Sequence, residues 1–233
     1  MTSSRLYSYC IPVDDGAAPN PYWGLCTLAI CKPRIRSTAK VGDWVAGTGA
    51  KFARLGDGGS KDMSGKLVYA MKVTRKVTMA EYDELTKREL PNKVPAWGDA
   101  EYRRRLGDSI YDFSRDPPRQ REGVHLPANA STDLGGRNVL LSTEFFYFGD
   151  KAVDLPDELR AIAQNRQGHR VGLNEPFVGR FIAWIVGLGH APGALIGKPL
   201  LNLFEDASCS RWCAATRGES DDQDEEVTQA ACA

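Results

Sequence analysis

The sequence lacks any long apolar run. The longest candidate, residues 177–188, is interrupted by Arg180 and is shorter than the roughly 20 apolar residues that a membrane-spanning helix needs. The first ten residues lack the charged and apolar regions of a secretory signal peptide. We therefore expect no membrane partner and a cytoplasmic location.

Metal-ligand spacing is also missing. The chain has six cysteines, and without an export signal we expect reduced thiols rather than disulfides. Cys10, Cys26 and Cys31 lie in apolar runs, where cysteine usually acts as a small buried residue. Cys209 and Cys213 are spaced to share one helix face, but no second ligand pair accompanies them. The sequence predicts no metal site and no cofactor.

The familiar catalytic motifs are absent. There is no Walker-type phosphate loop, no HExxH, no Gly-x-Ser-x-Gly and no Cys–His nucleophile motif, and the glycine-rich segment 56–60 has no lysine at the required spacing. Acid–base catalysis would need a histidine within hydrogen-bond reach of a carboxylate. The candidates are His125 or His169 with Asp14, Asp43 or Asp108. Whether the protein is an enzyme stays open.

Charge is unevenly distributed. The 30 acidic and 30 basic residues cancel, but six of the acids lie in residues 219–233, which contain no Lys or Arg. The rest of the chain therefore carries 24 acids against 30 basic residues. A basic body is compatible with an anionic partner. We expect one domain over residues 1–204 and a C-terminal segment, 205–233, with a disordered acidic tail.

Local patterns predict short strands and a few short helices. Alternating or apolar runs bounded by turn signals predict strands at 5–12, 24–31, 43–48, 66–77, 109–113 and 138–148. Thr78 and Glu81 form a capping-box pattern ahead of a helix, and further helices are predicted at 34–40, 157–165 and 177–188. Strands this close in sequence leave little room for crossovers. We expect an α+β fold built on a small, curled, mostly antiparallel β-barrel with short peripheral helices.

Several blocks in a fixed order resemble one family. They are LYSYCIPVDDGAAPNPYWGLCTLAICKPRIRSTAKVGDWVAGTG, LVYAMKVT, GDSIYDF, VLLSTEFFYFG and GHR. Over about residues 5–200 the chain resembles the second type of nucleotide modification associated domain. That family occurs in bacteria and phages, is linked by gene context to DNA base modification and conflict systems, and has no firmly assigned activity. The resemblance implies a modified nucleotide or nucleic acid as partner.

A second resemblance concerns the fold. Lys40-Val41-Gly42-Asp43-Trp44-Val45 is similar to the strand start of the PUA-like fold, which includes EVE-like and YTH-like binders of modified bases. In that fold a curled barrel places aromatic side chains around one base. By analogy, this chain would read a base by aromatic stacking and hydrogen bonds, with cations or glycine turns at the phosphates.

The resulting hypotheses are a binding module and an enzyme. As a binding module, the protein would recognise a modified nucleotide or base in DNA. Its ligand-binding candidates are Asn20, Lys32, Arg36, Trp44, Gly47, Thr48, Gly49, Tyr69, Tyr111, His125, His169 and Arg170. As an enzyme, it would act on a modified nucleotide with a His–carboxylate pair. A histidine hydrogen-bonded to a carboxylate at a pocket would favour catalysis. The sequence does not define an oligomeric state.

Overall fold

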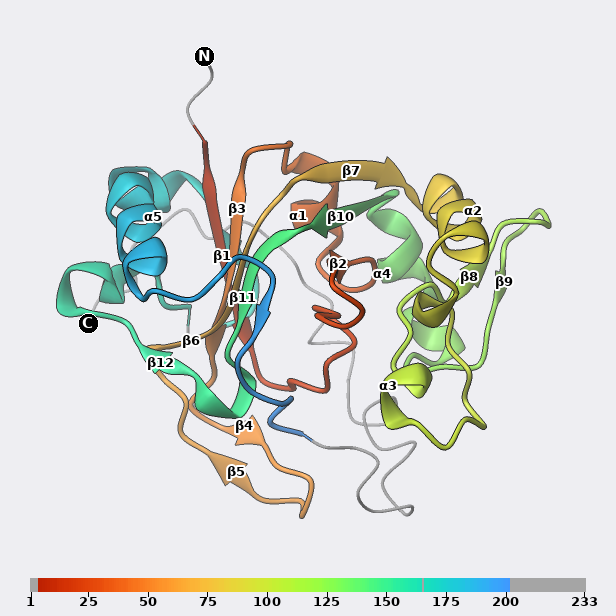
Figure 1. Ribbon diagram of the computed structural model, residues 1–233, viewed down its shortest axis with the longest axis horizontal. Helices are drawn as coiled ribbons and strands as arrows, with labels where there is room; N and C mark the ends of the chain where they lie inside the picture. The colour runs from red at the N-terminus through yellow and green to blue at the C-terminus, as the bar shows by residue number, and fades with distance from the viewer. Residues whose placement is uncertain (1–3, 165, 202–233) are drawn as a thin grey trace.

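A mixed open sheet organises the molecule (Figure 1). The computed structural model describes residues 4–164 and 166–201. The strand order is β13-β1-β3-β6-β11-β14, with β12 also paired to β6. These strands are β13 (His169–Arg170), β1 (Leu6–Ile11), β3 (Trp44–Gly49), β6 (Lys66–Lys72), β11 (Glu144–Tyr147), β14 (Ala194–Leu195) and β12 (Val153–Asp154). The acidic tail, Cys209 and Cys213 lie outside the described residues.

Smaller elements surround this sheet. A second sheet has the order β2-β10-β7, and two further strand pairs form hairpins. These strands are β2 (Cys26–Leu28), β10 (Asn138–Ser142), β7 (Arg75–Thr78), β4 (Ala53–Arg54) with β5 (Ser60–Lys61), and β8 (Tyr111–Asp112) with β9 (Arg119–Gln120). The α-helices are α1 (Pro33–Thr38), α2 (Met79–Arg88), α3 (Tyr102–Arg105), α4 (Ala130–Gly135) and α5 (Val178–Gly187). The 3₁₀ helices are η1 (Pro91–Lys93), η2 (Pro127–Asn129), η3 (Gly149–Lys151), η4 (Asp157–Ile162) and η5 (Gly172–Phe177).

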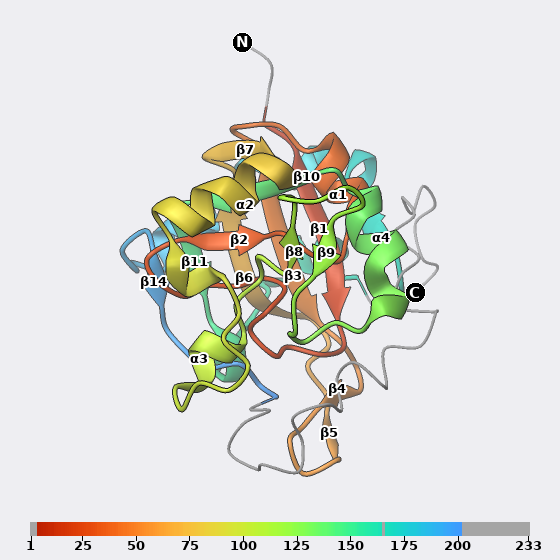
Figure 2. The same cartoon turned by 90° about the vertical axis from the view of Figure 1, so that its right-hand side faces the viewer.

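Both faces of the large sheet are covered. Alternate residues of β1 and β3 point to opposite faces, as the two-residue period of a strand requires. Leu6 and Trp44 pack with α5 and η4, whereas Tyr7 and Val45 pack with β2, α1 and β10. Figure 1 shows α5 on one side of the sheet and α1 with the second sheet on the other. Figure 2 views the molecule from the side of β2.

The predicted barrel is wrong, because the sheets are open. The fold is α+β, but the two-residue strands β13 and β14 lie at opposite ends of the large sheet and do not pair with each other. The sheet is also mixed: β1 runs parallel to β3 over Leu6–Ile11 and Trp44–Gly49. The segment between them supplies the crossover through β2 and α1, as a parallel pair requires. With apolar residues on both faces, the sheet is buried as a layer and does not need to close.

The run 66–77 forms two strands instead of one. β6 ends at Lys72, and the Thr74 amide then donates to the Leu141 carbonyl at 2.9 Å, which carries the chain into the second sheet. The capping box at the next helix is confirmed. Thr78 accepts from the Glu81 amide, and the Glu81 side chain accepts from the Thr78 amide. This reciprocal pair fixes the start of α2.

Asp14 makes the stability of this fold dependent on pH. Tyr147 Oη donates to Asp14 Oδ1 at 2.5 Å, and the Leu200 amide donates to Oδ2 at 3.2 Å. Burial raises the pKa of Asp14 to about 7, although both hydrogen bonds lower it. Between about pH 4 and pH 7 the native state therefore keeps a proton that the unfolded state has released.

The free energy of unfolding should accordingly fall as pH rises through this window. The Asp14 contribution, about 4 kcal/mol at most, should disappear in Asp14→Asn, because the amide does not titrate. Urea unfolding of both proteins from pH 4 to pH 8 measures the difference. Parallel curves for the two proteins would contradict this assignment.

Candidate active site

Cys31 lies at a sharp turn between β2 and α1. Its φ is 58° and that of Lys32 is 41°, so two successive non-glycine residues adopt the left-handed region. Such conformations cost free energy and concentrate at functional sites. The Arg36 Nε donates to the Cys31 carbonyl at 2.6 Å, and the Arg36 amide donates to the Lys32 carbonyl at 3.0 Å. The first turn of α1 therefore holds the strained pair in place.

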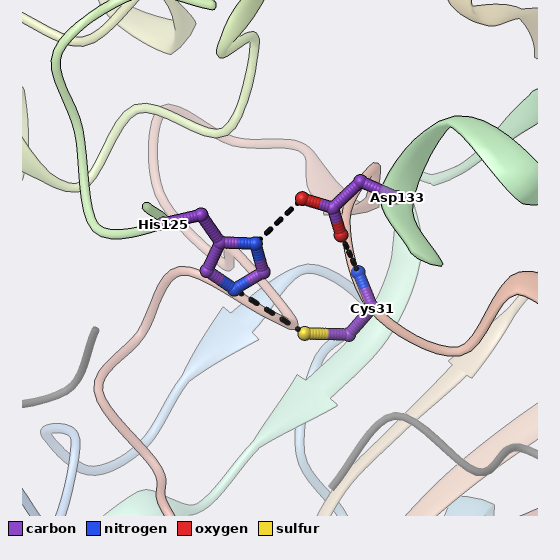
Figure 3. Close-up of side chains that lie close together, drawn as sticks. All are labelled: Cys31, His125 and Asp133. Carbon is purple, nitrogen blue, oxygen red and sulfur yellow. Dashed lines mark hydrogen bonds and ion pairs between the residues drawn. The ribbon is translucent and has the colours of Figure 1, made fainter. Parts of the chain in front are cut away.

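Two distant residues converge on this turn (Figure 3). His125 precedes η2, and Asp133 lies in α4; both side chains are almost completely buried. Asp133 Oδ1 accepts from the Cys31 amide at 2.8 Å, and Asp133 Oδ2 lies 2.6 Å from His125 Nδ1. On the other side of the ring, His125 Nε2 lies 3.5 Å from Cys31 Sγ. The imidazole therefore bridges a thiol and a carboxylate.

The hydrogen bonds define which way a proton can move. Burial alone would raise the pKa of Asp133, but the charge and hydrogen bond of His125, the Cys31 amide and Arg36 lower it overall. An ionised carboxylate only accepts, so His125 Nδ1 carries the proton. In the neutral imidazole, the lone pair of Nε2 then faces Cys31 Sγ. His125 can accept the thiol proton while Asp133 stabilises the imidazolium, which is how a nucleophile is activated in Cys–His sites.

The same three residues have ligand atoms within 4.8 Å of one another and could be considered as a metal site. Zinc sites use three or four protein ligands whose donor atoms face the ion. Here both Asp133 oxygens already accept hydrogen bonds, and His125 Nδ1 is directed at that carboxylate. Only His125 Nε2 and Cys31 Sγ remain directed toward a shared point. The geometry fits proton transfer better than metal coordination.

Two further side chains support the carboxylate and its helix. Tyr111 Oη donates to Asp133 Oδ2 at 3.0 Å, and burial raises the Tyr111 pKa, so the phenol stays a donor. Arg36 is completely buried, and besides the Cys31 carbonyl it donates to the Asp133 carbonyl at 2.5 Å and the Asn138 carbonyl at 2.9 Å. Arg36 thus joins the backbone at the thiol to the backbone at the carboxylate.

Replacing Arg36 should therefore destabilise the whole site. In Arg36→Met, three carbonyls lose a donor, and each buried unsatisfied group costs about 1–3 kcal/mol. We expect the free energy of unfolding to fall by about 3–5 kcal/mol, measured by urea denaturation. Arg34→Met, an exposed position on the same helix, is the control and should change it by less than about 1 kcal/mol. Equal losses in both variants would contradict the role of Arg36.

Cys31 borders a pocket at the carboxyl ends of β1 and β3. The cavity has a volume of about 400 Å³. Because β1 and β3 are parallel, the residues that follow them meet at one edge of the sheet, and the crossover brings Cys31 and Lys32 to the same place. Open sheets commonly bind ligands at the carboxyl ends of parallel strands. The lining residues are Tyr9, Cys10, Ile11, Pro12, Val13, Ala18, Cys31, Lys32, Ala50, Lys51, Phe52, Arg166 and Gln167.

Of the twelve ligand-binding candidates from the sequence, Lys32 is the one that lines this pocket, while His125 and Tyr111 join the thiol site. Trp44 is 4% exposed and packs edge-to-face on Phe181. Tyr69 is buried, and its hydroxyl forms a hydrogen bond with Tyr9 Oη at 2.9 Å. The structure therefore puts both rings of the expected aromatic cage in the core.

The remaining candidates are also inside the fold. Asn20 donates to the Leu106 carbonyl and accepts from Lys93, and Thr48 donates to the Tyr9 carbonyl. Gly47 and Gly49 permit close packing against β3: a Cβ on Gly47 would lie 2.3 Å from Ile11 Cδ1, and one on Gly49 would lie 2.4 Å from Met63 Cβ. His169 is buried in β13, and Arg170 donates to the Ala161 carbonyl. Arg36, expected at phosphates, is the buried arginine described above.

The sequence analysis missed Cys31 and Asp133. Cys31 was expected in the core, but it is partly exposed, in contrast to the buried Cys26. His125 was expected beside Asp14, Asp43 or Asp108, and its partner is Asp133, eight residues further along the chain. The available signals were the Cys-Lys-Pro sequence at a predicted strand end and, far along the chain, a polar segment, residues 114–137, that holds a histidine and an aspartate.

The comparisons with known proteins are consistent with the family resemblance. No curated protein and no solved structure is significantly similar to the chain. The family model described as nucleotide modification associated domain 2 matches residues 3–206, which is most of the chain. Among the described residues, no helix has the length and apolar character needed to cross a bilayer. The chain therefore belongs to the nucleotide modification associated domain 2 family, whose name indicates a role in nucleotide modification.

Proposed function

We propose that the protein is a cysteine-dependent enzyme of nucleotide modification in which Cys31 is the nucleophile. The observation that carries this proposal is the chain of contacts from Cys31 Sγ through His125 to Asp133 at the wall of a pocket. The same arrangement of thiol or hydroxyl, imidazole and carboxylate serves acyl transfer on unrelated folds. We therefore assign the reaction to hydrolysis or transfer at an acyl-type carbon of a modified nucleotide.

Each residue has a defined part in the proposed reaction. His125 Nε2 takes the proton from Cys31 Sγ as the sulfur bonds to the substrate carbon, and the imidazolium then gives that proton to the departing amine or alcohol. A water or second acceptor, deprotonated by the same imidazole, attacks the thioester carbon, and the Cys31 thiolate leaves and regains its proton. Asp133 stays ionised throughout and stabilises the imidazolium.

A search for substrate tests this proposal. The full-length protein is incubated with pooled modified nucleoside monophosphates and single-stranded oligonucleotides, and their consumption is followed by mass spectrometry. We expect one class to be consumed by the wild type and by Cys26→Ala, but not by Cys31→Ser or His125→Gln. Consumption that persists in Cys31→Ser would exclude the thiol mechanism.

A binding module without turnover, recognising a modified base in DNA, is the second candidate. Its support is the cationic pocket itself, which would serve recognition as well as catalysis. The cage proposed around Trp44 and Tyr69 does not support it, because both rings are buried. Tight binding of a modified nucleotide, unchanged by Cys31→Ser and never followed by product, would favour this alternative.

A further inference from the structure

The charged side chains that line the pocket all carry positive charge. Among the described residues that line it, Lys32, Lys51 and Arg166 are cationic and none is acidic. None of these three cations forms an ion pair with a carboxylate in the part of the chain that the structure describes. The Asp62 carboxylate interacts electrostatically with Lys51 without a direct ion pair. Cations gathered in a concave site raise the local concentration of anions. The pocket is therefore suited to an anionic ligand.

Lys32 is held beside the nucleophile. Its Nζ lies 5.1 Å from the centre of the Tyr9 ring, which forms part of the pocket wall. The Tyr9 hydroxyl forms a hydrogen bond with the hydroxyl of the buried Tyr69 at 2.9 Å. This hydrogen bond holds the Tyr9 ring, against which the Lys32 ammonium group lies, in position. Lys32 follows Cys31 directly. Both residues line the pocket, so an anionic group that contacts Lys32 would share the pocket with the thiol.

The aromatic ring of Phe52 also lines this pocket. Phe52 is 70% exposed although it is one of the largest apolar side chains in the protein. Lys51 Nζ lies 5.8 Å from the centre of the Phe52 ring, so a cation and an exposed π-face are presented together. Stacking of a base on an aromatic side chain contributes about 1–3 kcal/mol and tolerates any base.

The size of the pocket limits the ligand. A volume of about 400 Å³ is within the range of small-molecule sites, roughly 300–1,000 Å³, and is too small for a duplex. We infer that this pocket binds one nucleotide unit, with its phosphate against Lys32, Lys51 and Arg166, its base on Phe52, and its modified group toward Cys31. This inference deepens the proposed function and rests on it for the role of Cys31.

Binding to the Cys31→Ser protein tests this inference without turnover. Isothermal titration compares deoxynucleoside 5′-monophosphates with the matching nucleosides and with inorganic phosphate. We expect the monophosphates to bind at least tenfold more tightly than either. Adding Lys51→Glu or Phe52→Ala should weaken monophosphate binding about tenfold or more. Lys151→Glu, an exposed lysine outside the pocket, is the matched control and should leave binding unchanged.

Each outcome has a separate meaning. Equal affinity for nucleosides and monophosphates, or binding that is insensitive to Lys51→Glu and Phe52→Ala, overturns the inference. Sensitive binding without any turnover supports the nucleotide site and contradicts the enzyme proposal instead. A single-stranded oligonucleotide is the final arm: if it competes with the monophosphate, the unit is read within a strand, and if it does not, the ligand is the free nucleotide.

Discussion

The substitution Cys31→Ala is expected to reduce turnover of the nucleotide substrate by at least about 10³-fold, because the proposed covalent intermediate forms on the Cys31 sulfur. The effect should fall on kcat, since removing the sulfur leaves the cations and Phe52 in place. Steady-state kinetics on the substrate found in the screen measures the change, and the thermal midpoint of unfolding confirms that the variant is folded.

Cys26→Ala is the matched control for this substitution. Cys26 lies in β2, five residues before Cys31, but it is completely buried and burial raises its pKa to about 12. It cannot act as a nucleophile at neutral pH, because the thiolate is the reactive form. The control should therefore retain activity within about tenfold of the wild type. If the two alanine variants lose activity equally, the defect is structural and the assignment of Cys31 fails.

The substitution Asp133→Asn should have the second-largest effect, a loss of about 10²–10⁴-fold in kcat. The amide can donate to His125 Nδ1, which would reverse the tautomer and turn the protonated Nε2 toward Cys31 Sγ. The substitution would also replace one of the two carboxylate oxygens, so that either the Cys31 amide or the Tyr111 hydroxyl loses its acceptor. The kinetic loss should be accompanied by a lower free energy of unfolding.

Tyr111→Phe separates the effect of Asp133 on stability from its effect on the tautomer of His125. It removes one hydrogen bond to Asp133 Oδ2 but leaves the bond to His125 and the negative charge in place. We expect a stability loss of about 1–2 kcal/mol and less than about tenfold in kcat. If Tyr111→Phe and Asp133→Asn reduce kcat to the same degree, the carboxylate does not act through the tautomer of His125.

Local rules predicted much of the secondary structure. The alternation in β1, the capping box of α2 and the apolar run of α5 are determined by residues close together in the chain, and each element forms near the predicted position. The barrel was a wrong prediction because strand pairing is not local. No local pattern between Ile11 and Trp44 indicates that β1 and β3 run parallel. The segment between them contains β2, which belongs to the second sheet, so the sequence resembles that of three consecutive antiparallel strands.

The candidate site was predictable only in part. His125 and a carboxylate were considered together, but the thiol lies 94 residues before His125 in the chain. The correct aspartate lies in α4, within residues 114–137, for which the sequence predicted neither a strand nor a helix. Trp44 and Tyr69 have the residue types of a base-binding cage. Their positions on a sheet covered on both faces place them in the core instead. Burial, and not residue type, decides between these roles.

The rate of alkylation of Cys31 by iodoacetamide at pH 7 tests the central claim most directly. Peptide mapping by mass spectrometry resolves Cys31 from the other thiols, so no substrate is needed. The relay through His125 predicts rapid labelling of Cys31 in the wild type and labelling at least tenfold slower in His125→Gln and Asp133→Asn. Equal rates of Cys31 labelling in all three proteins would contradict the account.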